Sequence, residues 1–155
     1  MKIPISKAKE TDYSYFINAF HQHKQLRFSK KNASALVNIV IKEEGKIPQS
    51  INIVFVDDAT MKLLHKRYLY SKQTTDVITF RLNKGKNIDG EIYVCLDQAR
   101  RQSYEFNQTF SQEVARLIVH GSLHLVGYND ATNRQRSQMT KKEDFYLNQF
   151  YQHQN

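Results

Sequence analysis

Two histidines stand four residues apart in the segment HGSLHLVGYND, which covers residues 120–130. On a helix, side chains at i and i+4 lie on one face, one turn apart. His120 and His124 can therefore direct two imidazole nitrogens toward one zinc ion, at about 2.0–2.1 Å each. The next turn of the same helix cannot complete a tetrahedral site, so the chain must turn back to supply a third ligand.

A glycine and an aspartate follow the histidine pair at positions that suit this third ligand. Gly127 is the residue type that most easily adopts the left-handed conformation that reverses a chain after a helix. Asp130 comes six residues after His124 and carries a carboxylate, which binds zinc at about 2.0–2.2 Å. A histidine pair alone also occurs in ordinary cores, but this combination predicts one Zn²⁺ ion held by His120, His124 and Asp130.

The predicted site leaves the fourth zinc position open to water. Zinc in such a site lowers the pKa of bound water to about 7 and polarises a phosphoryl or carbonyl oxygen, so the chemistry expected is hydrolysis. The frame H-x-x-x-H-x-x-G-x-x-D is similar to the zinc frame of metzincin proteases. However, Gly121 stands where a metalloprotease carries its catalytic glutamate, which argues against peptide hydrolysis.

The two histidines require a helix, and the sequence predicts one that begins after Asn107. Thr109 and Gln112 have the spacing of a capping box. An apolar stripe then faces the core, formed by Val114, Leu117, Ile118, Gly121 and Leu125. Gly127 is expected to end this helix.

The remaining elements are predicted from periodicity and turn residues. Helices are expected over 30–44, 59–68, 97–106 and 133–150, strands over 13–20, 50–56, 75–80 and 91–96, and a turn over 87–90. No linker or composition shift divides the chain. We therefore expect one domain over residues 1–155, of the α+β class, with a mixed, mostly parallel sheet packed with helices and a zincin-like zinc helix.

Composition limits the class of protein. The 155 residues are 40% apolar and 12% aromatic, which is typical of a packed core and not of a disordered chain. The single cysteine, Cys95, excludes an intramolecular disulfide, fits a reducing compartment and is expected to be an inert core thiol. No apolar run suits a signal peptide or a membrane span, so we expect a cytoplasmic protein without a membrane partner.

The chain is strongly basic. Its 23 Lys and Arg residues outweigh 15 Asp and Glu residues, giving a net charge of +8. This excess favours a polyanionic partner, although a basic surface that serves only solubility is an equally ordinary explanation. Tyr68, Tyr70 and Tyr104 lie among the basic clusters and suit the stacking of single-stranded bases.

The segment HGSLHLVGYND resembles the signature HGxLHLxGYDH of the YbeY family, bacterial rRNA maturation factors with endoribonuclease activity. SINIVFVDDATMKLLHKRYL, TTDVITF and DGEIYVCLDQA resemble other landmarks of that family, so the similarity covers roughly residues 30–150. The resemblance implies a zinc-dependent endoribonuclease that prefers single strands. It also implies rRNA and the small ribosomal subunit as partners, with roles in 16S rRNA 3′-end maturation and ribosome quality control. By position, the zinc ligands are again His120, His124 and Asp130.

Two positions depart from the family pattern. The third family histidine falls on Asp130, whose negative charge should lower the Lewis acidity of the metal. The family's Tyr-Arg pair before the TDV strand is Tyr68-Leu69 here. The arginine expected to bind phosphate is therefore absent, and its role is left unfilled. Arg67 and Arg81 are the candidate replacements. Both departures resemble a branch of the family that pairs YL with GYxD.

Two further acidic residues are candidates for supporting roles. Asp76, with Thr75, could position substrate at the end of its strand, although a cap or a turn is the more ordinary role. Glu113 lies two turns before His120 on nearly the same face and could support it, although a solvated helix charge is the more ordinary expectation.

The sequence also allows two other functions. The metzincin-like frame allows a metallopeptidase or another zinc hydrolase, against which Gly121 and the positive charge argue. The residue Leu69 gives weight to a non-catalytic ribosome assembly factor that uses zinc structurally.

Overall fold

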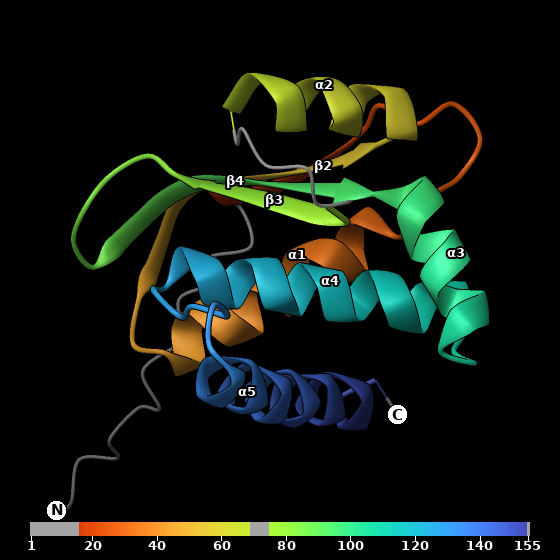
Figure 1. The fold of residues 1–155 in the computed structure, drawn as a ribbon. Helices are drawn as coiled ribbons and strands as arrows, with labels where there is room; N and C mark the ends of the chain where they lie inside the picture. The colour runs from red at the N-terminus through yellow and green to blue at the C-terminus, as the bar shows by residue number, and fades with distance from the viewer. Residues whose placement is uncertain (1–15, 69–74, 155) are drawn as a thin grey trace, which may run out of the picture.

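A mixed four-stranded sheet lies at the centre of the computed structural model, which describes residues 16–68 and 75–154 (Figure 1). The strand order is β1 (Ile17–His21), β2 (Ile47–Val56), β4 (Asn87–Cys95) and β3 (Val77–Arg81). β1 pairs parallel with β2, β2 pairs parallel with β4, and β3 pairs antiparallel with β4 at the edge. The expected mixed, mostly parallel sheet of an α+β fold is therefore confirmed.

Helices cover both faces of this sheet. The described helices are α1 (Lys30–Glu43), α2 (Asp58–Tyr68), α3 (Leu96–Glu105), α4 (Phe110–Leu125) and α5 (Asn133–Gln152). α1 and α4 lie against one face, α5 packs outside them, and α2 lies alone on the opposite face (Figure 1). No described helix is both long and apolar enough to cross a membrane.

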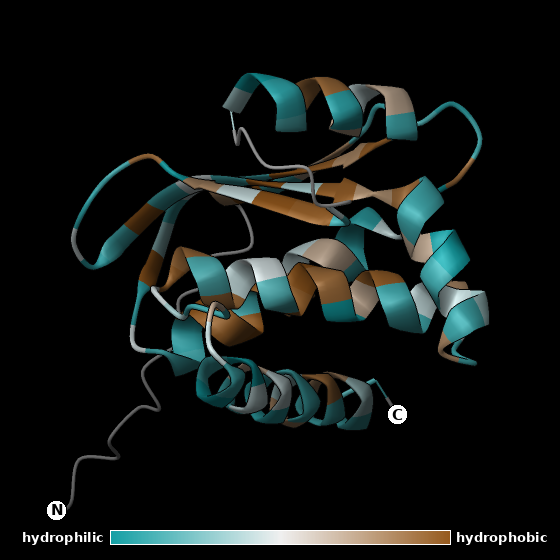
Figure 2. Cartoon of the chain, in the orientation of Figure 1, coloured by the Kyte–Doolittle hydropathy of each residue, from teal (hydrophilic) through white to brown (hydrophobic). Residues whose placement is uncertain are grey.

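The larger core lies between the sheet and α4. Alternate residues of β2 and β4 point toward it, including the fully buried Ile51, Ile53 and Ile92. Figure 2 shows apolar residues along the strands and along α4, which lies next to the sheet. A smaller cluster beneath α2 contains Val56 and Met61. The helix that carries the histidine pair is thus one of the best-packed elements of the described structure.

Most predicted elements occur within a few residues of their expected bounds, but the turn predicted over 87–90 is wrong. These residues begin β4 and pair with β2 from Ile47 onward. The chain reverses earlier, where Gly85 has a φ of 103°. The Asn83 side chain closes that turn, because its Oδ1 accepts from the Asp89 N–H at 3.0 Å and its Nδ2 donates to the Asn87 carbonyl at 2.7 Å. The predicted strand over 13–20 runs from Ile17 to His21, and residues 13–15 lie outside the described part.

Gly121 allows α4 to pack closely on the sheet. A Cβ atom at this position would lie 2.8 Å from Ile92 Cγ2, 3.2 Å from Thr79 Cγ2 and 3.3 Å from Val77 Cγ2. We therefore expect Gly121→Ala to lower the free energy of unfolding by about 1–3 kcal/mol, the usual cost of overpacking a core. This loss should occur although alanine favours a helix by about 1 kcal/mol over glycine.

Urea unfolding of Gly121→Ala measures this effect. Ser137→Ala, at an exposed position of α5, is the control and should change the free energy of unfolding by no more than about 0.5 kcal/mol. If Gly121→Ala is at least as stable as the wild type, the space between α4 and the sheet can accommodate a Cβ atom at this position, which would contradict the expected overpacking.

Candidate metal centre

His120, His124 and Asp130 lie together at the C-terminal end of α4. The two Nε2 atoms are 3.0 Å apart, and Asp130 Oδ2 lies 3.2 Å from His120 Nε2 and 3.3 Å from His124 Nε2. A tetrahedral ion with ligands at about 2.0–2.1 Å requires its ligand atoms to be about 3.3–3.4 Å apart. The triangle of two nitrogens and one oxygen therefore has the size and donor types that fit a zinc ion.

The end of α4 determines where Asp130 can lie. Gly127 has a φ of 107°, as its predicted role requires. Its N–H donates to the His124 carbonyl at 3.0 Å, and the Tyr128 N–H donates to the Leu123 carbonyl at 3.0 Å. These two bonds form a Schellman motif, which turns the chain back toward the helix it has just left.

The start of α5 holds the returning segment. The Arg136 guanidinium donates to the carbonyls of Asp130, at 3.2 Å, and Ala131, at 2.9 Å. Gln135 Oε1 accepts from the N–H groups of Ala131, at 3.0 Å, and Thr132, at 3.1 Å. The backbone around Asp130 is thus fixed from both ends, which places its carboxylate beside the two imidazoles.

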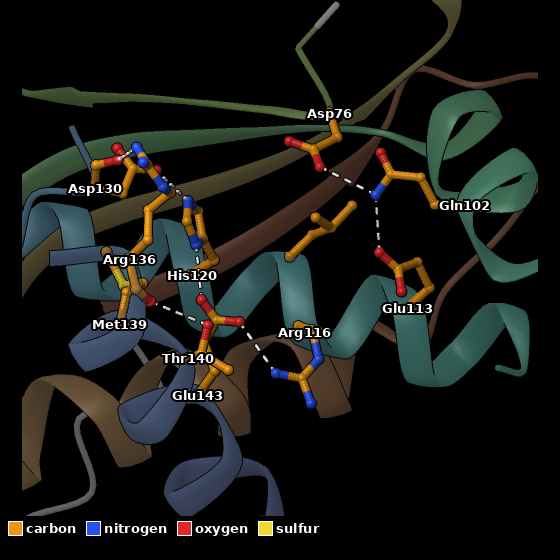
Figure 3. Close-up of a pocket in the computed structure, with 11 residues that line it drawn as sticks. Asp76, Gln102, Glu113, Arg116, His120, Asp130, Arg136, Met139, Thr140 and Glu143 are labelled. Atoms are coloured by element: carbon orange, nitrogen blue, oxygen red, sulfur yellow. Dashed lines mark hydrogen bonds and ion pairs between the residues drawn. The ribbon is translucent and has the colours of Figure 1, made fainter. Parts of the chain in front are cut away.

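Glu143 on α5 orients His120. Its Oε2 lies 2.8 Å from His120 Nδ1, and Arg116 Nη1 donates to its Oε1 at 3.1 Å (Figure 3). Arg116 Nη2 also donates to Asp144 Oδ1 at 2.8 Å. A carboxylate only accepts hydrogen bonds, so Nδ1 of a neutral His120 carries the proton and Nε2 keeps a lone pair that a metal ion could use. This is the usual support of a metal-binding histidine.

The same contacts act on the protonation of His120. Burial by itself would lower the pKa of His120, but the hydrogen bond and charge of Glu143 raise it, with further contributions from Asp130 and Asp76. The net direction is upward. Without a metal, this imidazole therefore holds its proton more firmly than a free histidine, and a binding metal ion must displace that proton.

A pocket opens beside these residues between α4, α5 and the sheet (Figure 3). Its lining includes His120 and Asp130 and extends along α4 and α5 to the start of β3, through Asp76, Gln102, Glu113, Arg116, Leu117, Arg136, Met139, Thr140 and Glu143. The lining combines acidic, basic and amide side chains. Such a surface suits a charged, polar ligand better than an apolar one.

Glu113 is not the solvated charge that the sequence favours. It is 5% exposed, and its Oε1 accepts from Gln102 Nε2 at 2.9 Å. The same Gln102 nitrogen donates to Asp76 Oδ2 at 3.1 Å, so Asp76 also has a defined partner in the pocket. Burial raises the pKa of Glu113, and the Gln102 hydrogen bond acts in the opposite direction.

Neither candidate replacement for the family arginine lines this pocket. Arg81 donates to the carbonyls of Leu125, at 2.8 Å, and Gly85, at 2.6 Å, and so ties the β3–β4 turn to the end of α4. Arg67 is exposed on α2, across the sheet from α4, with its guanidinium 5.5 Å from the centre of the Tyr68 ring. Leu69 lies outside the described residues.

The lining contains other residues that sequence reasoning did not single out. Arg116 and Arg136 are the arginines of the described lining, and Glu143 supports His120 directly. A signal for Glu143 exists in the sequence. It stands at helical spacing from the buried Met139 and Phe150, so an acidic side chain falls on the apolar face of α5, where it needs a partner.

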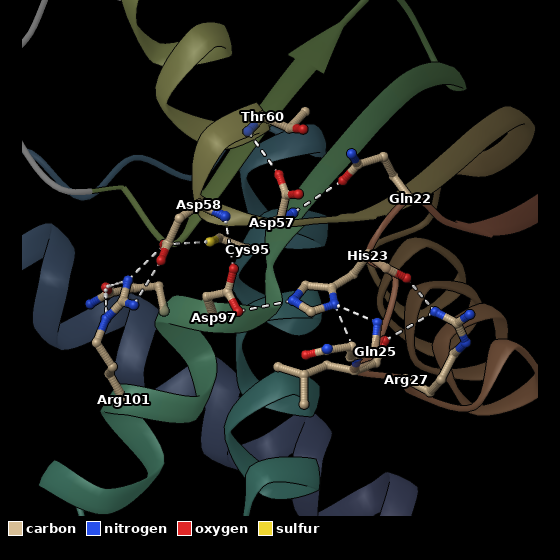
Figure 4. A network of polar contacts seen from close by, with 12 residues as sticks. Gln22, His23, Gln25, Arg27, Asp57, Asp58, Thr60, Cys95, Asp97 and Arg101 are labelled. Atoms are coloured by element: carbon tan, nitrogen blue, oxygen red, sulfur yellow. Dashed lines mark hydrogen bonds and ion pairs between the residues drawn. The ribbon is translucent and has the colours of Figure 1, made fainter.

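A second acidic cluster, formed by Asp58, Cys95 and Asp97, has a structural role (Figure 4). Arg101 donates to both carboxylate oxygens of Asp58, at 2.9 and 2.7 Å. Asp97 Oδ1 lies 2.9 Å from His23 Nε2, and Asp97 Oδ2 accepts from the Asp58 N–H at 2.8 Å. Burial raises the pKa of Cys95 to about 12, which agrees with the expected inert thiol.

The matching family profile and two similar curated proteins all belong to one family, endoribonuclease YbeY. The profile described as endoribonuclease YbeY matches residues 17–151. The chain is 35% identical over 133 residues to endoribonuclease YbeY of Karelsulcia muelleri, covering 86% of this chain and 91% of that protein. It is 39% identical over 114 residues to endoribonuclease YbeY of Chlorobium phaeobacteroides strain BS1, covering 74% and 83%.

A solved structure has the same fold. The solution structure of TM1509 from Thermotoga maritima superposes with a TM-score of 0.62 at 28% identity, covering 88% of this chain and 90% of that one. The matches in sequence extend from β1 to α5 and include the segment that carries His120, His124 and Asp130. This chain therefore belongs to the YbeY family of endoribonucleases.

Proposed function

We propose that this protein is a zinc-dependent endoribonuclease that cleaves single-stranded RNA, with one zinc ion bound by His120, His124 and Asp130. Membership of the family makes the chain a nuclease that acts on RNA. The observation that carries the zinc assignment is the triangle of two Nε2 atoms and one Oδ2 atom with separations of 3.0–3.3 Å. Its donor set of imidazoles and a carboxylate is one that zinc favours over magnesium or calcium.

The residues of the pocket have separate tasks in this proposal. When bound, zinc would supply Lewis acidity toward the scissile phosphate and lower the pKa of bound water. Glu143 keeps His120 in the tautomer that offers Nε2. The exposed Arg136 and the half-buried Arg116 present positive charge to a phosphodiester whose negative charge increases in the transition state.

We also infer that the substrate is rRNA of the small ribosomal subunit in the cytoplasm, with 16S 3′-end maturation and ribosome quality control as its setting. The net charge of +8 supports a polyanionic substrate. The signature segment supports the rRNA assignment by resemblance. A single strand fits better than a duplex, because its unstacked backbone can bend into a pocket between two helices.

The structure does not favour the alternative of a metallopeptidase. The protease base would stand at position 121, and this position faces β3 and β4 with 2.8 Å between a Cβ atom and Ile92 Cγ2. No glutamate can be accommodated there while α4 keeps its place on the sheet. No contact in the described structure favours a non-catalytic assembly factor either.

Removal and return of zinc test the proposed function. We expect chelator-treated protein to lose RNA cleavage and one equivalent of zinc to restore it, since zinc is expected to activate both the water and the phosphate. A single-stranded RNA should be cleaved, whereas the same RNA annealed to its complement should resist. Cleavage that persists in metal-free protein, or cleavage of a peptide in place of RNA, would contradict the proposal.

A further inference from the structure

One accessible carboxylate of the described pocket lining has no assigned task. Among the described residues, four carboxylates line it: Asp76, Glu113, Asp130 and Glu143. Asp130 is a ligand candidate, and Glu143 is bonded to His120 and Arg116. Glu113 is 5% exposed and is bonded to Gln102, so it is less accessible to a substrate than the half-buried Asp76. Asp76 is half-buried at the start of β3 and remains accessible from the pocket (Figure 3).

The packing of α4 against the sheet explains why a general base would come from a strand and not from α4 itself. In helices with the H-E-x-x-H pattern, the residue after the first histidine supplies the general base. Here that residue is Gly121, and its space is filled by β4 and β3, whose Ile92 Cγ2 and Val77 Cγ2 would lie 2.8 and 3.3 Å from a Cβ atom at 121. Asp76 directly precedes Val77. β3 is thus one of the two strands that limit the space at 121, and the same strand brings a carboxylate to the pocket.

Asp76 is held in a defined position. Its carbonyl accepts from the Cys95 N–H at 2.8 Å, which fixes the backbone to β4. Its Oδ2 accepts from Gln102 Nε2 at 3.1 Å, and the second hydrogen of that amide goes to the buried Glu113. Within residues 16–68 and 75–154, its other oxygen, Oδ1, has no hydrogen-bond partner. The described residues thus leave Oδ1 available to a proton of a bound ligand.

We propose that Asp76 is the proton acceptor of the cleavage reaction, an inference that rests on the proposed endoribonuclease function. Asp76 takes the proton of the attacking oxygen, which belongs to water or to a ribose 2′-hydroxyl. That oxygen forms a bond to phosphorus while the bond from phosphorus to the leaving ribose oxygen breaks. The leaving oxygen keeps the electron pair of that bond. It receives either the proton that Asp76 has taken or a proton from solvent, and in the second case Asp76 releases its own proton to solvent, so that both routes restore the carboxylate.

Asp76→Asn tests this role, because it keeps the shape of the side chain and removes its capacity to accept a proton. We expect zinc content to stay near one equivalent and the affinity for a single-stranded RNA, measured by fluorescence anisotropy, to stay undiminished. The single-turnover rate of cleavage should fall by about 10²–10⁴-fold, the usual contribution of a general base. Asp89→Asn is the matched control, since Asp89 is a half-buried aspartate of β4 outside the pocket lining, and its rate should be that of the wild type.

The outcomes separate this inference from the proposed function. If the wild type cleaves RNA and Asp76→Asn cleaves it at the same single-turnover rate, the inference is overturned and the proposed function stays intact. Loss of zinc from Asp76→Asn would also overturn it, because Asp76 would then serve metal retention. Wild-type protein that holds zinc and does not cleave RNA would overturn the proposed function, and this inference with it.

Discussion

Asp130→Ala is expected to remove zinc and RNA cleavage together. The substitution leaves two imidazole ligands and no carboxylate, since Asp130 Oδ2 is the third corner of the triangle, at 3.2 and 3.3 Å from the two nitrogens. Replacing a residue that only supports a ligand already weakens metal binding by about 10–100-fold, so loss of a ligand should weaken it by more than about 100-fold. Metal analysis and an RNA cleavage assay on the same samples measure both effects.

Two further variants show whether the carboxylate itself is responsible. Asp130→His should keep zinc and cleavage, because imidazole nitrogen is also a good zinc ligand and the returning segment keeps its backbone contacts. Asp89→Ala removes an acidic residue away from the site and should change neither quantity. The side chain of Asp130 is 43% exposed, so the free energy of unfolding of metal-free Asp130→Ala should stay near that of the wild type. Full zinc retention in Asp130→Ala would remove this residue from the ligand set.

Glu143→Gln is expected to weaken zinc binding by about 10–100-fold without removing any ligand. The amide keeps the size of the side chain but loses the negative charge. That charge holds the proton on His120 Nδ1, which lies 2.8 Å from Glu143 Oε2. The imidazole can then turn or exchange tautomers, and Nε2 is no longer held ready for the metal. Competition with a fluorescent chelator measures the dissociation constant for zinc.

Stability should respond far less than metal affinity in this variant. Arg116 keeps its bond to Asp144, at 2.8 Å, and its side chain is 37% exposed, so losing the Glu143 charge leaves no isolated buried cation. Glu105→Gln, at the exposed end of α3, is the control and should bind zinc like the wild type. Equal zinc affinity of Glu143→Gln and Glu105→Gln would mean that Glu143 has only a packing role.

The zinc helix could be predicted from sequence because its determinants are local. The capping box of Thr109 and Gln112 forms as predicted, with hydrogen bonds of 3.1 and 2.9 Å. Gly127 ends the helix with a positive φ. Each of these features depends on residues within one or two turns, and the spacing of His120 and His124 on one face follows from the same geometry.

The supporting residues could not be predicted in the same way, because they meet through the tertiary fold. Glu143 lies 23 residues after His120, and Asp76 lies 26 residues before its partner Gln102. No local rule states that α5 folds back along α4 or that α3 places Gln102 beside Asp76. The turn predicted over 87–90 failed for a related reason: Asn, Asp and Gly are common in turns, but pairing with β2 made these residues a strand.

The most direct test of the zinc assignment is a crystal structure of zinc-loaded protein with anomalous data collected at the zinc absorption edge. We expect one strong peak within about 2.0–2.2 Å of His120 Nε2, His124 Nε2 and Asp130 Oδ2. A peak at the cluster of Asp58, Cys95 and Asp97 instead, or a zinc ion bound by the two histidines with Asp130 turned away, would contradict the assignment.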